Sequence, residues 1–259
     1  MYRPDGYLER SPDIRTLETA TLTVEHLQNN SDTHKSAFSA IAELVDNAYD
    51  AEAKKCSIEM ETEDLRERLI IQDDGKGMSR EDALNVIKFG FSEKVGLDIG
   101  RYGNGLKTGS FHLGRDLLLL TKKDGVHTAL MISRTLLDAA DTNAQSTVYV
   151  PCPSTLLGDV YGDHPERFMD ELSLIYKYGP LNLDENLDDY FNRIEDHGTI
   201  LIIGKLLRKE AKGTYLKKIE HDHDLQVSAE EEDVTRVRPL CETSLREYLK
   251  ILYREPKMK

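Results

Sequence analysis

Long apolar runs are absent from this sequence. The longest are about four residues, as in 117–120 and 200–203, which is the length of a short strand and excludes a transmembrane helix. The first fifteen residues carry six charged side chains and lead into no apolar stretch, so we expect no signal peptide. The sequence also has no internal repeat.

Cysteine and basic charge are both scarce. The three cysteines, Cys56, Cys152 and Cys241, are odd in number and far apart, so they form neither a disulfide framework nor a zinc pattern. We therefore predict buried free thiols, as is usual in a reducing compartment. With 34 basic and 47 acidic residues the net charge is −13, which argues against a chain that coats nucleic acid by bulk charge. A local basic patch is still compatible with this balance.

The remaining composition is that of a folded protein. Of the 259 residues, 39% are hydrophobic and 31% are charged, and the length suffices for one large domain or two modest ones. Apolar spacings of three and four predict helices at 21–28, 36–54, 80–89, 164–178, 184–194 and 242–253. Alternating or contiguous apolar residues predict strands near 56–60, 69–71, 116–121, 127–133 and 199–203. We predict a polar, flexible arm over residues 1–20, a glycine-rich loop over 90–109 and a solvated acidic loop at 230–233.

These elements predict an α+β fold. We expect a mixed or antiparallel sheet with helices on one face, and a second set of elements that starts near residue 205.

The helix predicted at 36–54 has an unusual polar face. Glu43 and Asn47 are four residues apart and share this face, with Asp46 and Asp50 beside it, while the apolar stripe points the other way. A carboxylate one turn before an amide, on a helix anchored through its opposite side, can hold both groups over a site. Taken alone, the pattern also fits a solvated helix face.

A tight turn follows the strand near 69–71. It begins with Asp73 and contains Gly75 and Gly77, and glycines let the backbone approach a ligand closely. An aspartate at such a place can accept a hydrogen bond from the exocyclic amine of adenine, whereas guanine has an acceptor there. Taken alone, the turn more often indicates an ordinary hairpin.

The glycine-rich segment 100–109 matches neither common nucleotide loop. Gly100 and Gly105 have P-loop spacing, but Leu106 occupies the lysine position. Thr108 stands where the dinucleotide-binding pattern needs glycine. The backbone amides of such a segment can still surround phosphate oxygens, and Lys107 adds positive charge.

Together with a Gly-Thr strand start at 198–199, these elements form an ordered set that resembles the GHKL ATPase superfamily of gyrase, Hsp90, MutL and the histidine kinases. The sequence is most similar to the MORC (microrchidia) family. The strings that carry this resemblance are NNSDTHKSAFSAIAELVDNAYDA, DDGKGM, VIKFGFSEK, IGRYGNGLKTGS, LIYKYGP and SLREYLKILYREPKMK. It extends from about residue 16 to the end, although 205–235 matches little.

The resemblance implies a Bergerat ATP-binding sandwich of a mixed sheet and helices. The ATPase domain would span 21–205 after the arm at 1–20, and 206–259 would begin a truncated transducer-like (S5-like) domain.

The resemblance also implies a role for each matched residue. Glu43 would be the general base that activates water, and Asn47 would bind Mg²⁺ through its side-chain oxygen. Asp73 would bind adenine with support from Thr199, Asp50 would contact the ligand or one of its partners, and Asp46 would be structural. The residues that would shape the base pocket or close over the phosphates as a lid are Gly75, Gly77, Met78, Gly103, Asn104, Gly105, Leu106, Lys107 and Thr108.

The function implied is that of an Mg²⁺-dependent ATPase whose ATP-induced homodimer compacts chromatin and silences genes in the nucleus. DNA contacts would come from local patches or from regions outside this chain, and no membrane would be involved. No lysine matches the transducer lysine of the superfamily, so hydrolysis would be slow. Two alternatives are a degenerate nucleotide-binding module that serves protein interaction, and another branch of the superfamily.

Overall fold

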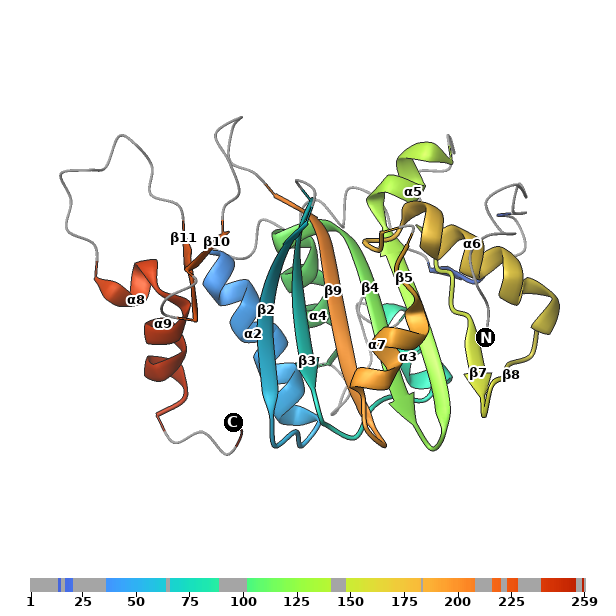
Figure 1. The fold of residues 1–259 in the computed structure, drawn as a ribbon, viewed down its shortest axis with the longest axis horizontal. Coiled ribbons are helices and arrows are strands. Elements are labelled where there is room, and N and C mark those ends of the chain that lie inside the picture. The colour runs from blue at the N-terminus through green and yellow to red at the C-terminus, as the bar shows by residue number, and fades with distance from the viewer. Residues whose placement is uncertain are drawn as a thin grey trace, which may run out of the picture.

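A seven-stranded sheet forms the centre of the protein (Figure 1). The computed structural model describes residues 14, 17–20, 36–63, 66–88, 102–140, 148–182, 184–207, 216–219, 223–227, 239–254 and 258. In spatial order the strands are β2 (Cys56–Glu63), β3 (Arg66–Asp73), β9 (Gly198–Leu206), β4 (Gly114–Lys123), β5 (Val126–Ser133), β7 (Ser154–Leu156) and β8 (Asp159–Val160). Each neighbouring pair described is antiparallel, which is one of the two arrangements expected from the sequence.

Helices cover both faces of this sheet, and the prediction of helices on one face is wrong. One face packs against α2 (Ala37–Asp50), α3 (Arg80–Lys88) and α4 (Tyr102–Leu113), and the other against α5 (Arg134–Ala139), α6 (Phe168–Tyr178) and α7 (Leu187–Arg193). In Figure 1, α2 and α4 lie behind the sheet and α7 in front of it. The physical reason is that β4 and β9 are continuous apolar runs, so their alternate side chains need a cover on each side.

The helix α2 confirms the prediction made for residues 36–54, although it ends earlier. Ser36 and Ser39 form a capping box at its start. Its apolar stripe, which includes Phe38 and Ile41, is buried in the core. The helix ends at Asp50, and the chain then passes through Glu52 with a φ of 61°, so the last predicted turn does not form.

Two other segments differ from their predictions. The C-terminal helix predicted at 242–253 is divided at Ser244 into α8 (Leu240–Thr243) and α9 (Leu245–Leu252), because Ser244 caps the second helix with its side chain. Residues 102–113, predicted as part of a glycine-rich loop, form the helix α4. Glycines favour loops in isolation, but here they allow α4 to pack closely on α2. Residues 89–101 lie outside the described residues.

The described residues of the predicted N-terminal arm are packed. Leu17 is buried, and Ile14 packs against the same apolar cluster. The short strand β1 (Thr19–Ala20) pairs with β6 (Val148–Tyr149). A flexible arm therefore stays a prediction only for the residues before these. The helix predicted at 21–28 and the acidic loop at 230–233 lie outside the described residues.

The described part of residues 206–259 packs beside α2. It comprises the hairpin of β10 (Leu216–Ile219) and β11 (Asp224–Val227), followed by α8 and α9. Tyr248 of α9 contacts Phe38 of α2 at 5.7 Å between ring centres, and the Tyr253 hydroxyl donates to the Asp46 carboxylate. This packing gives Asp46 a structural contact, while the domain boundary near residue 205 stays a prediction.

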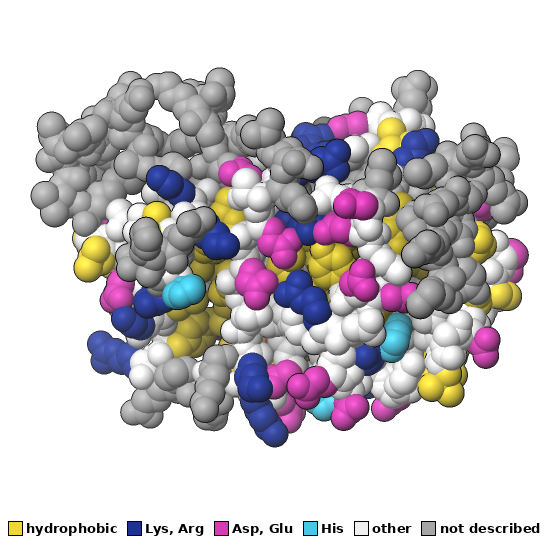
Figure 2. Space-filling model, in the orientation of Figure 1, with side chains coloured by type: hydrophobic (Ala, Val, Ile, Leu, Met, Phe, Trp, Pro, Cys, Tyr) yellow, Lys and Arg dark blue, Asp and Glu magenta, His cyan; other side chains and the backbone are white. Residues whose placement is uncertain are grey.

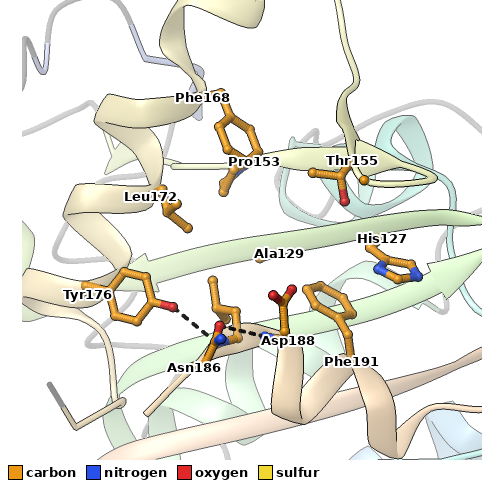
Figure 3. A pocket seen from close by; sticks show the side chains of 12 residues that line it. His127, Ala129, Pro153, Thr155, Phe168, Leu172, Tyr176, Asn186, Asp188 and Phe191 are labelled. Atoms are coloured by element: carbon orange, nitrogen blue, oxygen red, sulfur yellow. Dashed lines mark hydrogen bonds between the residues drawn. The ribbon is translucent and has the colours of Figure 1, made fainter. Parts of the chain in front are cut away.

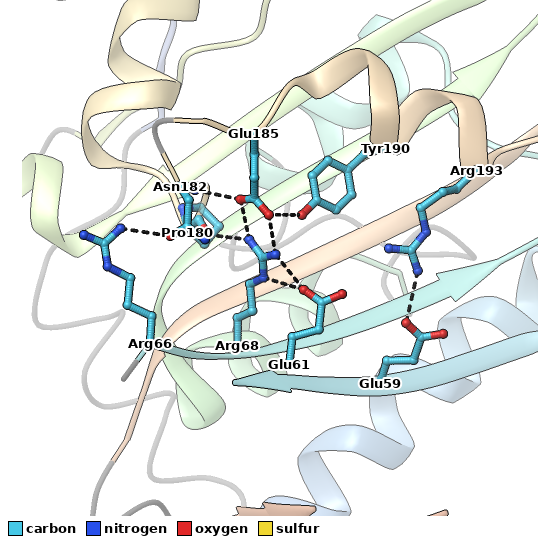
Figure 4. A network of polar contacts seen from close by, with 9 residues as sticks. All are labelled: Glu59, Glu61, Arg66, Arg68, Pro180, Asn182, Glu185, Tyr190 and Arg193. Atoms are coloured by element: carbon cyan, nitrogen blue, oxygen red, sulfur yellow. Dashed lines mark hydrogen bonds and ion pairs between the residues drawn. The ribbon is translucent and has the colours of Figure 1, made fainter. Parts of the chain in front are cut away.

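An ion-pair network joins the sheet to the connection between α6 and α7 (Figure 4). The guanidinium of Arg68 on β3 bonds to both carboxylate oxygens of Glu185 and to Glu61 of the neighbouring strand. Glu185 also accepts a bond from the Tyr190 hydroxyl at 2.8 Å and from the Asn182 N–H at 2.7 Å. Arg68 is 7% exposed, so these partners satisfy a nearly buried cation.

All three cysteines are free, but only Cys152 is buried, while Cys56 and Cys241 are half-buried. Across the described residues, no helix is both long and apolar enough to cross a membrane.

Candidate functional site

The polar face of α2 meets α4. Glu43 and Asn47 are both half-buried, whereas Asp46 and Asp50 are exposed. Gly105 of α4 lies directly against Glu43, since a Cβ atom at residue 105 would be 2.3 Å from Glu43 Oε1. Glycine is therefore required where α4 crosses the carboxylate, and the structure brings the predicted base and the predicted lid together.

Asn47 has a side-chain amide with an unsatisfied polar atom, which we call its open amide. Its Nδ2 atom is buried and has no hydrogen-bond partner among the described residues. A buried amide without a partner costs free energy, so its persistence fits a group that a ligand completes. The two ends of an amide are interchangeable in assignment, so its oxygen can face the same space. No group of three His, Cys, Asp or Glu in the described structure can hold a metal, but Mg²⁺ is commonly bound by one or two protein groups plus phosphates and waters. Asn47 fits that pattern.

Asp73 is the last residue of β3 and begins the turn that follows. Its Oδ1 accepts a bond from the Gly75 N–H at 2.8 Å. Burial raises the pKa of its carboxyl group to about 6, with the charge of Asp74 adding to this effect and the Gly75 bond opposing it. Asp74, which the sequence did not single out, has a separate structural role. Its Oδ1 accepts bonds from the Lys54 and Lys55 N–H groups, each at 2.7 Å, and fixes the turn to the segment that connects α2 with β2.

The glycines of this turn are needed for close approach. Gly77 has a φ of 62°, and a Cβ there would be 2.1 Å from the Lys122 carbonyl oxygen. A Cβ at residue 75 would likewise lie 2.7 Å from the Cβ atom of Ala51. The turn therefore sits directly against the C-terminal end of α2, which carries Asn47.

Thr121 is a site residue that sequence reasoning missed. It is fully buried on β4; its Oγ1 accepts a bond from the Met78 N–H at 2.8 Å and donates to the Gly198 carbonyl at 3.0 Å. Thr199, which was predicted, pairs with Asp73 on one side and Thr121 on the other. The only sequence signal for Thr121 is a polar residue that ends the run of four leucines.

Lys107 is placed differently from the other site residues. It is 2% exposed, its Nζ donates to the Ile87 carbonyl of α3 at 3.1 Å, and burial lowers its pKa to about 8. In this conformation the ammonium group therefore lies inside the protein instead of at an open phosphate site. Leu106 is buried and Thr108 half-buried, whereas the side chains of Gly103 and Asn104 are not described.

Known proteins are similar to this sequence. Residues 34–154 match the family described as "Histidine kinase-, DNA gyrase B-, and HSP90-like ATPase". The chain is 42% identical over 252 residues to "ATPase morc-1" of Caenorhabditis elegans and 39% identical over 253 residues to human "ATPase MORC2". These alignments cover 95% and 94% of this chain.

The chain contains a GHKL-type ATPase domain of the MORC family. It spans 29% of the length of the nematode relative and 24% of the human one, so the MORC-family domain corresponds to a minor part of those proteins. It is also 37% identical to "MORC family CW-type zinc finger protein 1" of mouse, with 94% of this chain and 26% of that protein covered.

Lowering the pH through about 6 is expected to weaken ATP binding to the MORC-family domain. If Asp73 accepts a hydrogen bond from the adenine amine, as the family resemblance implies, its raised pKa means that a proton competes with that amine. The affinity would then fall by up to about tenfold per pH unit below the pKa. The folded state binds this proton more tightly than the unfolded state, so protonated Asp73 stabilises the fold at low pH. This contribution to the free energy of unfolding is lost as the pH rises from 3.8 through about 6. Calorimetric titration at several pH values tests the affinity, and Asp73→Asn is the control in which this pH dependence disappears.

Replacing Thr121 with valine is expected to lower the free energy of unfolding by about 1–3 kcal/mol, because the Met78 N–H is left without an acceptor. It should also weaken ATP binding, since the turn at Gly77 loses its tie to β9. Urea unfolding and calorimetry measure the two effects. Thr128→Val is the matched control: it breaks a buried hydroxyl pair with Ser154 and should cost stability with no change in ATP affinity. Equal affinities of the two variants would contradict the positioning role.

Proposed function

We propose that this domain binds and hydrolyses ATP in the space bordered by α2, the Asp73 turn and α4. The observation that carries the proposal is the contact between Glu43 and Gly105, one helical turn from the open amide of Asn47. A potential base, a potential metal ligand and a glycine-lined helix converge there. The half-buried carboxylate of Asp73 begins the turn that packs against the C-terminal end of the same helix.

At the base end, Asp73 accepts a hydrogen bond from the adenine N6 amine. Guanine has a carbonyl oxygen at this position, so the carboxylate would face another acceptor, and the site selects adenine. Thr199 supports Asp73 from the neighbouring strand, and Gly75, Gly77 and Met78 shape the pocket.

At the phosphate end, Glu43 takes a proton from the attacking water while the water oxygen forms a bond to the γ-phosphorus and ADP leaves. Asn47 holds Mg²⁺, which when bound neutralises charge on the phosphate oxygens. Asp50 contacts the nucleotide directly or contacts a side chain that binds it. The phosphates are covered by the lid residues Gly103, Asn104, Gly105, Leu106, Lys107 and Thr108. For Lys107 this requires its ammonium group to leave the Ile87 carbonyl.

The wider role we propose is ATP-induced homodimerisation that drives chromatin compaction and gene silencing in the nucleus. Its support is membership of the MORC family and the local distribution of charge. Figure 2 shows acidic and basic side chains interspersed over the visible sheet face, with Lys and Arg side chains gathered toward the end that carries β10 and α9. The exposed cations of these two elements and the residues beside them are Lys217, Lys218, Arg246, Lys250 and Arg254. They offer a local contact for DNA phosphates despite the net charge of −13.

Light scattering tests binding and switching together. Addition of a non-hydrolysable ATP analogue with Mg²⁺ is expected to double the molar mass of the wild-type domain. Asn47→Ala is expected to bind no Mg²⁺–nucleotide and to stay monomeric. An unchanged ATP-induced dimer in Asn47→Ala would contradict the role of Asn47. If the wild-type domain dimerises with the analogue but hydrolyses no ATP in a separate turnover assay, the alternative is favoured, namely a nucleotide-binding module for protein interaction.

A further inference from the structure

A pocket lies on the sheet face opposite α2. It has a volume of about 220 Å³, is partly open to solvent and is lined by β5, β7, α6 and the start of α7 (Figure 3). Pockets for drug-sized ligands are roughly 300–1,000 Å³, so this one suits a smaller molecule. The sheet separates it from the proposed ATP site, and none of its lining residues belongs to that site.

Aromatic rings form much of the pocket wall. Phe168 and Tyr176 project from α6, and Phe191 projects from α7 and stacks on His127 with ring centres 4.9 Å apart. The Leu187 N–H donates to the Tyr176 hydroxyl oxygen at 3.2 Å, which fixes the Tyr176 ring at the pocket edge. Aromatic faces carry partial negative charge and attract cations. The walls therefore combine apolar area with a preference for positive charge.

The polar groups of the pocket point to the same ligand charge. Among the described residues that line it, Asp188 is the one acidic side chain and there is no Lys or Arg. In Figure 3 the Asp188 carboxylate points between the rings into the pocket. Burial lowers the pKa of His127, and nearby Lys122 lowers it further while Asp188 opposes both, so the imidazole adds no positive charge at neutral pH. An anionic ligand would face a carboxylate without a basic partner.

We propose that this pocket binds a small organic ammonium ion with an aromatic body. The aromatic body packs among Phe168, Tyr176 and Phe191, and the ammonium group donates to the Asp188 carboxylate. This site is independent of ATP binding, because it uses other residues on the other face of the sheet.

The test compares two probes of the same shape, 2-phenylethylammonium and the neutral 2-phenylethanol. Binding is followed by NMR through the backbone amide shifts of Ala129, Leu187 and Asp188, with and without a non-hydrolysable ATP analogue. The cation is expected to bind at least about threefold more tightly than the alcohol, as a partly exposed charge pair allows. The ATP analogue is expected to leave both affinities unchanged.

Two matched variants test whether the preference for the cation comes from the Asp188 carboxylate. Asp188→Asn is expected to weaken binding of the cation about threefold to fivefold and to leave the alcohol unaffected. Asp189→Asn removes the neighbouring exposed carboxylate, which does not line the pocket, and is expected to change neither. Both substitutions are at the exposed start of α7, so the fold is retained. The proposal is overturned if the two probes bind equally, if both variants have the same effect, or if neither probe shifts these amides.

Discussion

Replacing Glu43 with glutamine is expected to lower the rate of ATP hydrolysis by a factor of about 10² to 10⁴, the usual contribution of a general base. Glutamine keeps the shape of the side chain, so the contact with Gly105 survives. Only the ability to accept the proton of water is removed. ATP affinity is therefore expected to be retained, and if ATP induces the proposed dimer, the variant should accumulate in it. Turnover assays and calorimetry on the same preparation separate these two effects.

A neighbouring carboxylate provides the control for this experiment. Glu52 follows α2 and is exposed, so Glu52→Gln is expected to keep wild-type turnover. If Glu43→Gln hydrolyses ATP at the wild-type rate, Glu43 is not the base. If it no longer binds ATP, Glu43 serves the binding site instead of the chemical step.

Replacing Arg68 with methionine is expected to lower the free energy of unfolding by about 3 kcal/mol, because Glu185 and Glu61 lose the cation that compensates their burial. Burial alone would raise the pKa of Glu185, but bonds from Arg68, the Asn182 N–H and Tyr190 lower it below its usual value. This depressed pKa stabilises the fold at neutral pH, and the stabilisation is lost as the pH falls through the folded-state value. Chemical unfolding by urea at pH 7 measures the change.

Arg66→Met is the matched control for Arg68→Met. Arg66 belongs to the same strand, is exposed and bonds to the Asn182 side chain at 3.0 Å, so its loss is expected to cost no more than about 0.5 kcal/mol. Equal destabilisation by the two variants would show that the network around Glu185 contributes no more than an exposed contact. Methionine retains the apolar stem of the side chain, so the comparison isolates the guanidinium group.

The sequence predicts those parts of the protein that local patterns determine. The helix α2 has an unmistakable apolar period, and its polar face places Glu43 and Asn47 together, as the structure describes. The contiguous apolar strand near 69–71 is buried on both sides, as its composition indicates. Family membership follows from ordered motifs and is confirmed by the comparisons.

The remaining features depend on contacts between distant segments. A glycine-rich stretch on its own predicts a loop. In α4 the glycines are needed for another reason, because Glu43 occupies the space where a Cβ at residue 105 would lie, and this explains why the segment was predicted as a loop. Helices on both sheet faces follow from two apolar surfaces, but no local pattern says which helix covers which surface. Thr121 acts through Met78 and Gly198, residues 43 and 77 positions away, so nothing near it in the sequence reports its role.

The run of four leucines in β4 has a consequence for how the strand finds its partners. A shift by one residue would exchange the leucines between two faces that are both apolar, so hydrophobic burial alone discriminates weakly between registers. The polar residues at the ends of the run are different. Asp116 accepts bonds from the Ser133 and Thr135 hydroxyls, and Thr121 bonds to Gly198 and Met78. These two side chains therefore determine the register of β4, because a strand shifted by one residue would bury both of them without hydrogen-bond partners.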